Sequence, residues 1–316
     1  MGDKSPKISI PGRMLPIAAA AVVAAAAVLW LYLGSTLVTV REVRVHLPGL
    51  APADDGLRVA ILSDPHFAPG DNGRAAGLAE KLNRLKPDLI VLLGDFVNGS
   101  PDRSESFSPA ELTRFVSALR ARCGVFAVTG THEMWYGREA VVRALRKGGA
   151  TVLRDGSVTA ATPSGRPLQI VGLSDFSTEE PDAFPSLAPG IPTLVLMHDP
   201  RSALYVPEKL PCFCLAGHTH GGQLRLIPGG SDRTSLRLMV VRLKNKLGML
   251  SIVQRPYALF DRGFTDFHGR RMFITSGVGG YPMRLRLFCP PELVLLRLGA
   301  AEDPAGAPAY HIPEEL

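Results

Sequence analysis

The chain has 316 residues, of which 46% are hydrophobic and 20% charged, and its 35 Lys and Arg outnumber its 29 Asp and Glu, for a net charge of +6. This composition excludes a disordered protein, and four cysteines are too few to staple a chain of this length with disulfides. The positive charge is spread along the chain without a polybasic arm, so we expect no nucleic-acid partner.

A long apolar segment lies near the N-terminus. No charged residue occurs between Arg13 and Arg41, and residues 15–33 read LPIAAAAVVAAAAVLWLYL. As a helix, these 19 residues would cross a hydrocarbon core of about 30 Å. The alternative is a cleaved signal peptide, but the segment exceeds an h-region of about 7 to 15 residues and no clear small-x-small cleavage site follows it. We therefore expect a transmembrane anchor at residues 15–34, after an N-terminal tail at 1–14.

The flanking basic residues favour one orientation of this anchor. Lys4, Lys7 and Arg13 precede it, whereas Arg41 and Arg44 follow it. Because basic residues accumulate on the cytoplasmic side of a span, this small excess favours a cytoplasmic N-terminus. The rest of the chain would then be extracytoplasmic.

From residue 57 to residue 298, short apolar runs alternate with loops and amphipathic stretches, which is typical of an α/β domain. Predicted strands cover residues 59–62, 89–93, 125–128, 168–172, 193–197 and 213–216, and predicted helices cover 74–85, 109–121 and 138–147. Apolar segments at 272–275 and 292–298 would complete a second sheet. We expect residues 35–56 to be a linker and residues 299–316, rich in Ala, Pro and acids, to be a loose tail.

Five of the predicted strands are followed by side chains of the types that bind metals. They are Asp64 and His66 in SDPHF, Asp95 in LLGDFVNG, His132 in VTGTHE, His198 in LVLMHDP, and His218 with His220 in LAGHTHGGQ. Any one of them alone would most simply be a helix cap or a satisfied loop residue. Together they indicate one site, because ligands of open α/β sheets bind at the carboxyl ends of the strands.

This ordered set of motifs resembles the calcineurin-like metallophosphoesterases. The segments Gly-His-Thr-His-Gly-Gly-Gln at 217–223 and Val-Thr-Gly-Thr-His-Glu at 128–133 are most similar to a membrane-anchored bacterial branch that includes UDP-2,3-diacylglucosamine hydrolases. The resemblance covers roughly residues 57–298, including the late Arg-Leu-Phe-Cys-Pro-Pro-Glu segment at 286–292. It implies a four-layer αββα sandwich of two mixed sheets, with two divalent metal ions at one edge.

Carried over by the resemblance, metal one would be bound by Asp64, His66, Asp95 and His220, and metal two by Asp95 as a bridge with His198 and His218. Imidazole and carboxylate ligands suit Mn, Fe or Zn. A bridging carboxylate holds two ions about 3.5 to 4 Å apart, close enough to share a water that becomes hydroxide near neutral pH. Both ions would also receive phosphoryl oxygens.

His132 resembles the catalytic histidine of the family. Next to the ligands, it could protonate the leaving oxygen or stabilise the transition state. Its neighbour Glu133 could orient the imidazole, or it could be a solvated acid at a helix start.

Two positions depart from the family pattern. Thr131 replaces the usual Asn of Gly-Asn-His, and Asn98 replaces the second acid of Gly-Asp-x-x-Asp. The Asn98 change affects only a supporting contact. At Thr131, however, a hydroxyl replaces an amide oxygen that would bind metal two directly or support its ligands. Metal two is therefore expected to be looser, depleted or of a different element.

A basic and apolar stretch at residues 233–255 contains six Lys and Arg and no acid. It favours contact with an anionic membrane surface or a lipid substrate, although a solvated hairpin would have the same composition. Arg284 and Arg286 could bind a substrate phosphate, but surface charge is an equal explanation.

The motifs together predict a metal-dependent phosphoesterase. It would use a metal-bridging hydroxide to hydrolyse a phosphomonoester, phosphodiester or pyrophosphate bond of a lipid-linked or envelope substrate. The alternative is a membrane-tethered metal-binding or regulatory module with little turnover. The presence of His132 favours the enzyme, since a binding role needs no proton donor.

Overall fold

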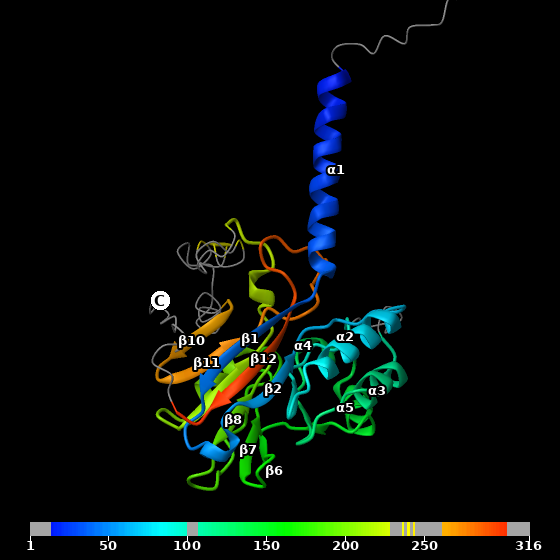
Figure 1. Ribbon diagram of the computed structural model, residues 1–316. Coiled ribbons are helices and arrows are strands. Elements are labelled where there is room, and N and C mark those ends of the chain that lie inside the picture. The colour runs from blue at the N-terminus through cyan, green and yellow to red at the C-terminus, as the bar shows by residue number, and fades with distance from the viewer. Residues whose placement is uncertain are drawn as a thin grey trace, which may run out of the picture.

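Two mixed β-sheets of six strands each form the body of the chain in the computed structural model (Figure 1). The structure describes residues 14–99, 107–227, 236, 239–240, 243 and 261–301. The first sheet has the order β1 (Thr39–His46), β12 (Glu292–Gly299), β2 (Leu57–Leu62), β3 (Leu89–Leu92), β4 (Val125–Ala127) and β5 (Thr151–Val152). The second has the order β10 (Gly263–Phe267), β11 (Arg270–Ile274), β9 (Cys212–Ala216), β8 (Thr193–Leu196), β7 (Pro167–Gly172) and β6 (Gly156–Ala161).

The central strands of both sheets run parallel, so their carboxyl ends share an edge. Strands β2, β3 and β4 pair in parallel in the first sheet, and β7, β8 and β9 do so in the second. Nearly every residue of these strands is buried. A parallel sheet covered on both faces needs such continuous apolar runs, and this is why the sequence pattern located these strands.

Two predictions about the sheets are wrong. Strand β12, expected to complete the second sheet, lies in the first, where it pairs parallel with β1 and antiparallel with β2. Residues 35–56, expected as a linker, contain β1, whose eight residues all pair with β12. Alternation appears only from Glu42 to Val45, where Val43 and Val45 are the more buried residues and Glu42 and Arg44 are exposed, as in an edge strand.

Three apolar clusters hold the layers together. One lies between the two sheets and joins Ile61 and Val91 to Ile170 and Leu196. A second lies between the first sheet and the helices α2 (Asn72–Arg84), α3 (Pro109–Ser117) and α5 (Arg138–Lys147), which gather on one side in Figure 1. A third covers the outer face of the second sheet. Within the described ranges, the covering elements there are the short 3-10 helix η2 (Pro200–Tyr205) and an irregular segment rather than an α-helix.

The outer helices confirm the predicted amphipathic segments, with α3 ending four residues earlier than expected. Helix α3 begins at Pro109, where the Ser108 side chain accepts the Glu111 N–H and the Glu111 carboxylate accepts the Ser108 N–H. A further short helix, α4 (Thr131–Tyr136), was not predicted. It begins directly after β4, and this places Thr131 and His132 in its first turn.

Helix α1 (Met14–Thr36) projects away from the sheets (Figure 1). Its segment Pro16–Thr36 is long and apolar enough to cross a membrane, and none of it is buried inside the protein. Near its C-terminal end, the Trp30 ring contacts the Phe288 ring edge-on at 5.6 Å. The structure thus places the end of α1 beside the loop that precedes β12.

Candidate metal centre

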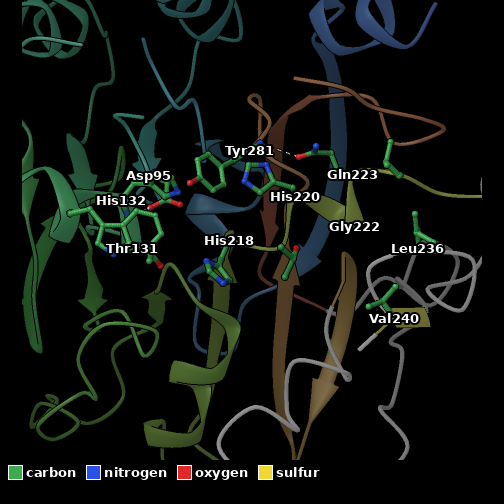
Figure 2. Close-up of a pocket in the computed structure, with 13 residues that line it drawn as sticks. Asp95, Thr131, His132, His218, His220, Gly222, Gln223, Leu236, Val240 and Tyr281 are labelled. Atoms are coloured by element: carbon green, nitrogen blue, oxygen red, sulfur yellow. Dashed lines mark hydrogen bonds between the residues drawn. The ribbon is translucent and has the colours of Figure 1, made fainter. Parts of the chain in front are cut away.

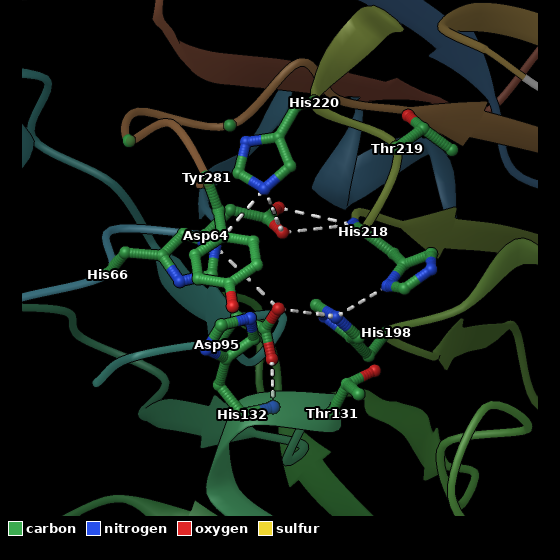
Figure 3. A network of polar contacts seen from close by, with 12 residues as sticks. Asp64, His66, Asp95, Thr131, His132, His198, His218, Thr219, His220 and Tyr281 are labelled. Atoms are coloured by element: carbon green, nitrogen blue, oxygen red, sulfur yellow. Dashed lines mark hydrogen bonds and ion pairs between the residues drawn. The ribbon is translucent and has the colours of Figure 1, made fainter. Parts of the chain in front are cut away.

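The predicted ligands meet at one edge of the molecule (Figure 3). Asp64 and His66 follow β2, Asp95 follows β3, His198 follows β8, and His218 with His220 follows β9. The first three residues belong to one sheet and the last three to the other. The site therefore lies at the seam where the carboxyl ends of both parallel regions meet.

Two of the groups formed by the ligand-type atoms lie on either side of the Asp95 carboxylate. Asp64, His66 and His220 form one group and Asp95, His198 and His218 the other, with ligand atoms within 4.8 Å of one another in each. Asp95 Oδ2 lies 3.2 Å from His198 Nε2 and 3.7 Å from His66 Nε2, between the groups. From this position one carboxylate could contact an ion in either group.

The donor atoms fit a pair of divalent cations. His66 Nε2 and His220 Nε2 face each other at 3.1 Å, as do His198 Nε2 and His218 Nδ1 at 3.2 Å. Two imidazole nitrogens that both point their lone pairs at one space repel unless a proton or a cation lies there. Imidazoles with carboxylates suit Mn, Fe or Zn.

Burial and charge set the protonation states of these groups. Burial lowers the pKa of both His66 and His220 well below the usual histidine value. Burial opposes the charged form of Asp95 as well, but the neighbouring histidines, His198 foremost, hold the pKa of this carboxyl well below its usual range. Neutral imidazoles and an ionised carboxylate are the forms that bind metals. The same carboxylate raises the pKa of His198 against the effect of burial, so this position attracts positive charge.

The site is built on unusual backbone. Asp64, His66, Asp95, His218 and His220 all have positive φ, between 42° and 67°. Left-handed backbone is rare for residues other than Gly, costs roughly 1 to 3 kcal/mol at each position, and clusters at functional sites. A glycine is required beside it, because a Cβ at Gly130 would lie 2.5 Å from Asp95 Oδ1 and 2.7 Å from the His198 ring.

Glu133 is neither a solvated acid nor a partner of the His132 ring. Its carboxylate is fully buried and accepts the backbone N–H groups of Asp95, Phe96 and Gly130 at 2.7 to 2.8 Å. Burial and the nearby Asp95 charge raise the pKa of Glu133 to about 7. Its role is to tie the loop after β3 to the start of α4.

His132 lies over the site and lines its pocket. Its Nδ1 accepts the Gly99 N–H at 3.1 Å, so the neutral ring carries its proton on Nε2. Burial lowers the pKa of His132. The ring packs between His66, Trp135 and Tyr281, with centroid distances of 4.3 to 4.6 Å.

The pocket at this edge has a volume of about 560 Å³ (Figure 2). Asp95, Thr131, His132, His218 and His220 line its polar end, and Trp135, Leu224, Leu236, Val240 and Tyr281 supply apolar lining. Leu236 and Val240 belong to the stretch 233–255 that was expected to contact a lipid, whereas Trp135, Leu224 and Tyr281 were not predicted. Tyr281 comes from a glycine-rich loop and Trp135 from an exposed helix position, neither of which carries a sequence signal.

Two buried acids next to the ligands were also missed. Asp199 lies 3.9 Å from His218 Nε2 and is paired with Arg201. Asp175 accepts the Thr131 hydroxyl at 3.0 Å, and burial raises the pKa of Asp175 to about 6. Both acids follow a predicted strand within three residues, as Asp64 and His198 do. Asp175 was not singled out because no glycine or second ligand-type residue flanks it.

The two predicted phosphate-binding arginines do not line the pocket. The Arg286 side chain is buried and donates to the carbonyl oxygens of Ser276, Gly279 and Cys289. Arg284 pairs with Asp71. The geometry therefore gives Arg286 a structural role in holding the loop before β12. The basic residues of 233–255 lie outside the described residues.

Comparison with known proteins gives a consistent set of relatives. Residues 57–222 match a family model described as calcineurin-like phosphoesterase. The phosphodiesterase YaeI of Escherichia coli (strain K12) is 31% identical over 221 residues, which cover 67% of this chain and 71% of that protein. The UDP-2,3-diacylglucosamine pyrophosphatase LpxG of Chlamydia muridarum is 26% identical over 328 residues, covering 88% and 95%. The uncharacterized metallophosphoesterase YkuE of Bacillus subtilis (strain 168) is 26% identical over 252 residues, covering 77% and 79%.

Proposed function

The chain belongs to the calcineurin-like phosphoesterases, a family of hydrolases, and on this basis we propose that it cleaves a phosphoester or pyrophosphate bond of a lipid-linked substrate at a membrane surface. The observation that carries this proposal is the composition of the pocket. Its polar end holds the candidate ligands Asp95, His218 and His220. Its apolar lining, with Leu224 and Tyr281, is suited to acyl chains rather than to a sugar or a nucleotide alone.

In the proposed site, Asp64, His66 and His220 bind one divalent ion, His198 and His218 bind a second, and Asp95 binds both. When bound, the two ions would supply positive charge to phosphoryl oxygens and lower the pKa of a shared water. His132 would present its Nε2–H to the leaving oxygen, while the Gly99 N–H keeps the ring in that orientation.

Exposed apolar side chains support the membrane location. Met283 is 60% exposed beside Tyr281, and Leu226 and Ile227 are each 55% exposed after Leu224. The loop that carries Tyr281 and Met283 also carries Phe288, against which α1 packs. A retained anchor at this position would keep the apolar mouth of the pocket close to the lipid surface, on the extracytoplasmic side if the basic flanks set the orientation.

Acyl recognition can be tested with the substrate named for the Chlamydia relative. We expect full-length protein in detergent with Mn²⁺ to hydrolyse UDP-2,3-diacylglucosamine with a higher kcat/KM than UDP-glucosamine, which lacks the chains. Leu224→Ser should raise the KM for the acylated compound by about tenfold, because roughly half of a leucine's transfer free energy is lost. Leu204→Ser, which changes an exposed leucine on η2, is the matched control. Equal kcat/KM for both compounds would contradict the acyl-binding role.

Membrane retention is tested by fractionation. Full-length protein should sediment with membranes and resist carbonate extraction, because the apolar helix Pro16–Thr36 remains attached to β1. Protease access to a C-terminal tag in intact cells then reports the side of the membrane. Recovery of a mature N-terminus near residue 40 would instead identify the helix as a signal peptide.

A further inference from the structure

The second ion of the proposed site has fewer protein ligands than the first. Asp64, His66 and His220 form the first group, with Asp95 Oδ2 3.7 Å from His66 Nε2, whereas Asp95, His198 and His218 form the second. Thr131 lines the same pocket beside these residues (Figures 2 and 3). A threonine hydroxyl is by itself a weak neutral ligand. The strength of its oxygen as a metal ligand therefore depends on the group that accepts its hydrogen.

The hydrogen of the Thr131 hydroxyl is held by a carboxylate. Thr131 Oγ1 donates to Asp175 Oδ2 at 3.0 Å. A hydroxyl that donates its hydrogen to a charged acceptor keeps its lone pairs free and becomes a stronger donor of electrons. The pair therefore offers an oxygen of greater negative character than threonine alone.

Asp175 is placed by the fold for this contact. It follows β7 at the same sheet edge at which His198 follows β8, and the two strands run parallel side by side. The Asp175 side chain is almost fully buried, at 1% exposure, and Thr178 is its other hydroxyl donor, at 3.1 Å to Oδ2. Its Oδ1 accepts no hydrogen bond from any residue in the described part of the chain.

A buried carboxylate held in this way is costly without a nearby positive charge. Leaving one buried acceptor unsatisfied costs about 1 to 3 kcal/mol, and more for a charged group. A neighbouring buried acid, Asp199, is paired with Arg201, whereas the hydrogen bonds that the Asp175 carboxylate accepts come from hydroxyls. A cation at the adjacent ligand group would stabilise this carboxylate, as the charged form of the neighbouring His198 also does.

We propose that Thr131 and Asp175 act as a pair that completes the second metal site, with the Thr131 oxygen facing the ion and Asp175 holding the hydroxyl hydrogen. Asp175 is a positioning residue that acts through Thr131. The inference rests on the proposed function. It also revises the expectation of a loose second site, since the pair compensates for the absent amide.

The test measures Mn²⁺ binding to full-length protein in detergent by titration calorimetry, with metal analysis after dialysis. Wild-type protein is expected to bind two ions. Asp175→Asn keeps the shape of the side chain but removes its charge, and should raise the Kd of the second ion by about 10- to 100-fold, the usual effect of losing a partner of a metal ligand, without changing the first. Asp155→Asn is the matched control, because Asp155 bonds to Ser174 of the same segment and not to Thr131.

A double-mutant cycle tests whether Asp175 affects the second ion through the Thr131 hydroxyl. Thr131→Val should weaken the second ion, Thr131→Ser should retain it, and Asp175→Asn should add no further loss in the Thr131→Val background. Additive losses, or unchanged affinity in Asp175→Asn, would overturn the pair. These outcomes would not contradict the proposed function. The proposed function is contradicted separately if wild-type protein binds two ions and hydrolyses no phosphoester.

Discussion

Asp95→Asn is expected to abolish both metal binding and hydrolysis. Asp95 Oδ2 lies between the two ligand groups, 3.2 Å from His198 Nε2 and 3.7 Å from His66 Nε2, so one charge serves both ions. Asparagine can preserve the hydrogen bond that Asp95 Oδ1 accepts from the backbone N–H of His132 at 2.8 Å. It removes, however, the negative charge that both ions share. Metal ions supply several kcal/mol of transition-state stabilisation, so we expect turnover to fall by at least about 10⁴-fold.

Metal content by mass spectrometry and turnover of bis-p-nitrophenyl phosphate check this result together. Asp55→Asn is the control, since Asp55 pairs with Arg44 at the surface. An Asp95→Asn protein that retains two ions would show that the bridge is dispensable.

His132→Ala is expected to lower kcat by roughly 10² to 10⁴ while leaving both ions bound, which is the usual yield of a positioned proton donor. The ring lines the pocket but accepts the Gly99 N–H through Nδ1, so the group available to substrate is Nε2. His132→Asn separates the two functions, because an amide oxygen can accept the Gly99 N–H but cannot replace Nε2. We expect it to be as slow as His132→Ala.

Metal content decides between two roles for this residue. His66, Asp95 and His132 also form a group with ligand atoms within 4.8 Å of one another. If His132→Ala loses an ion, the residue is a ligand rather than a proton donor. His268→Asn, in the exposed turn between β10 and β11, controls for the loss of an imidazole elsewhere.

The sequence predicted the parts of the site that follow buried parallel strands. Asp64, Asp95 and His198 each come directly after an apolar run, and the topology of parallel strands brings such positions to one edge. It could not predict contacts made by loops far apart in sequence. Tyr281 reaches the His66 ring, at 5.6 Å between centroids, from a loop more than 200 residues later, and nothing in its local sequence indicates that partner.

The wrong predictions have a common physical origin. Apolar runs show that β12 is a strand, but they do not say which sheet it joins, since both sheets offer it a buried face. Arg286 looks identical in sequence to a phosphate-binding arginine. Only the folded chain shows that carbonyl oxygens of its own loop surround the guanidinium.

The position of the ligands at the seam between the sheets gives the ions a second consequence. Asp64 and Asp95 belong to one sheet and His198 and His220 to the other, so a bound cation would cross-link the two halves of the sandwich. By thermodynamic linkage, a ligand present at 100 times its Kd stabilises the folded state by about 2.7 kcal/mol. Chains made when metal is scarce would unfold more often and be degraded sooner. Metal supply would thus control how much of this protein the cell contains, as well as how fast each copy works.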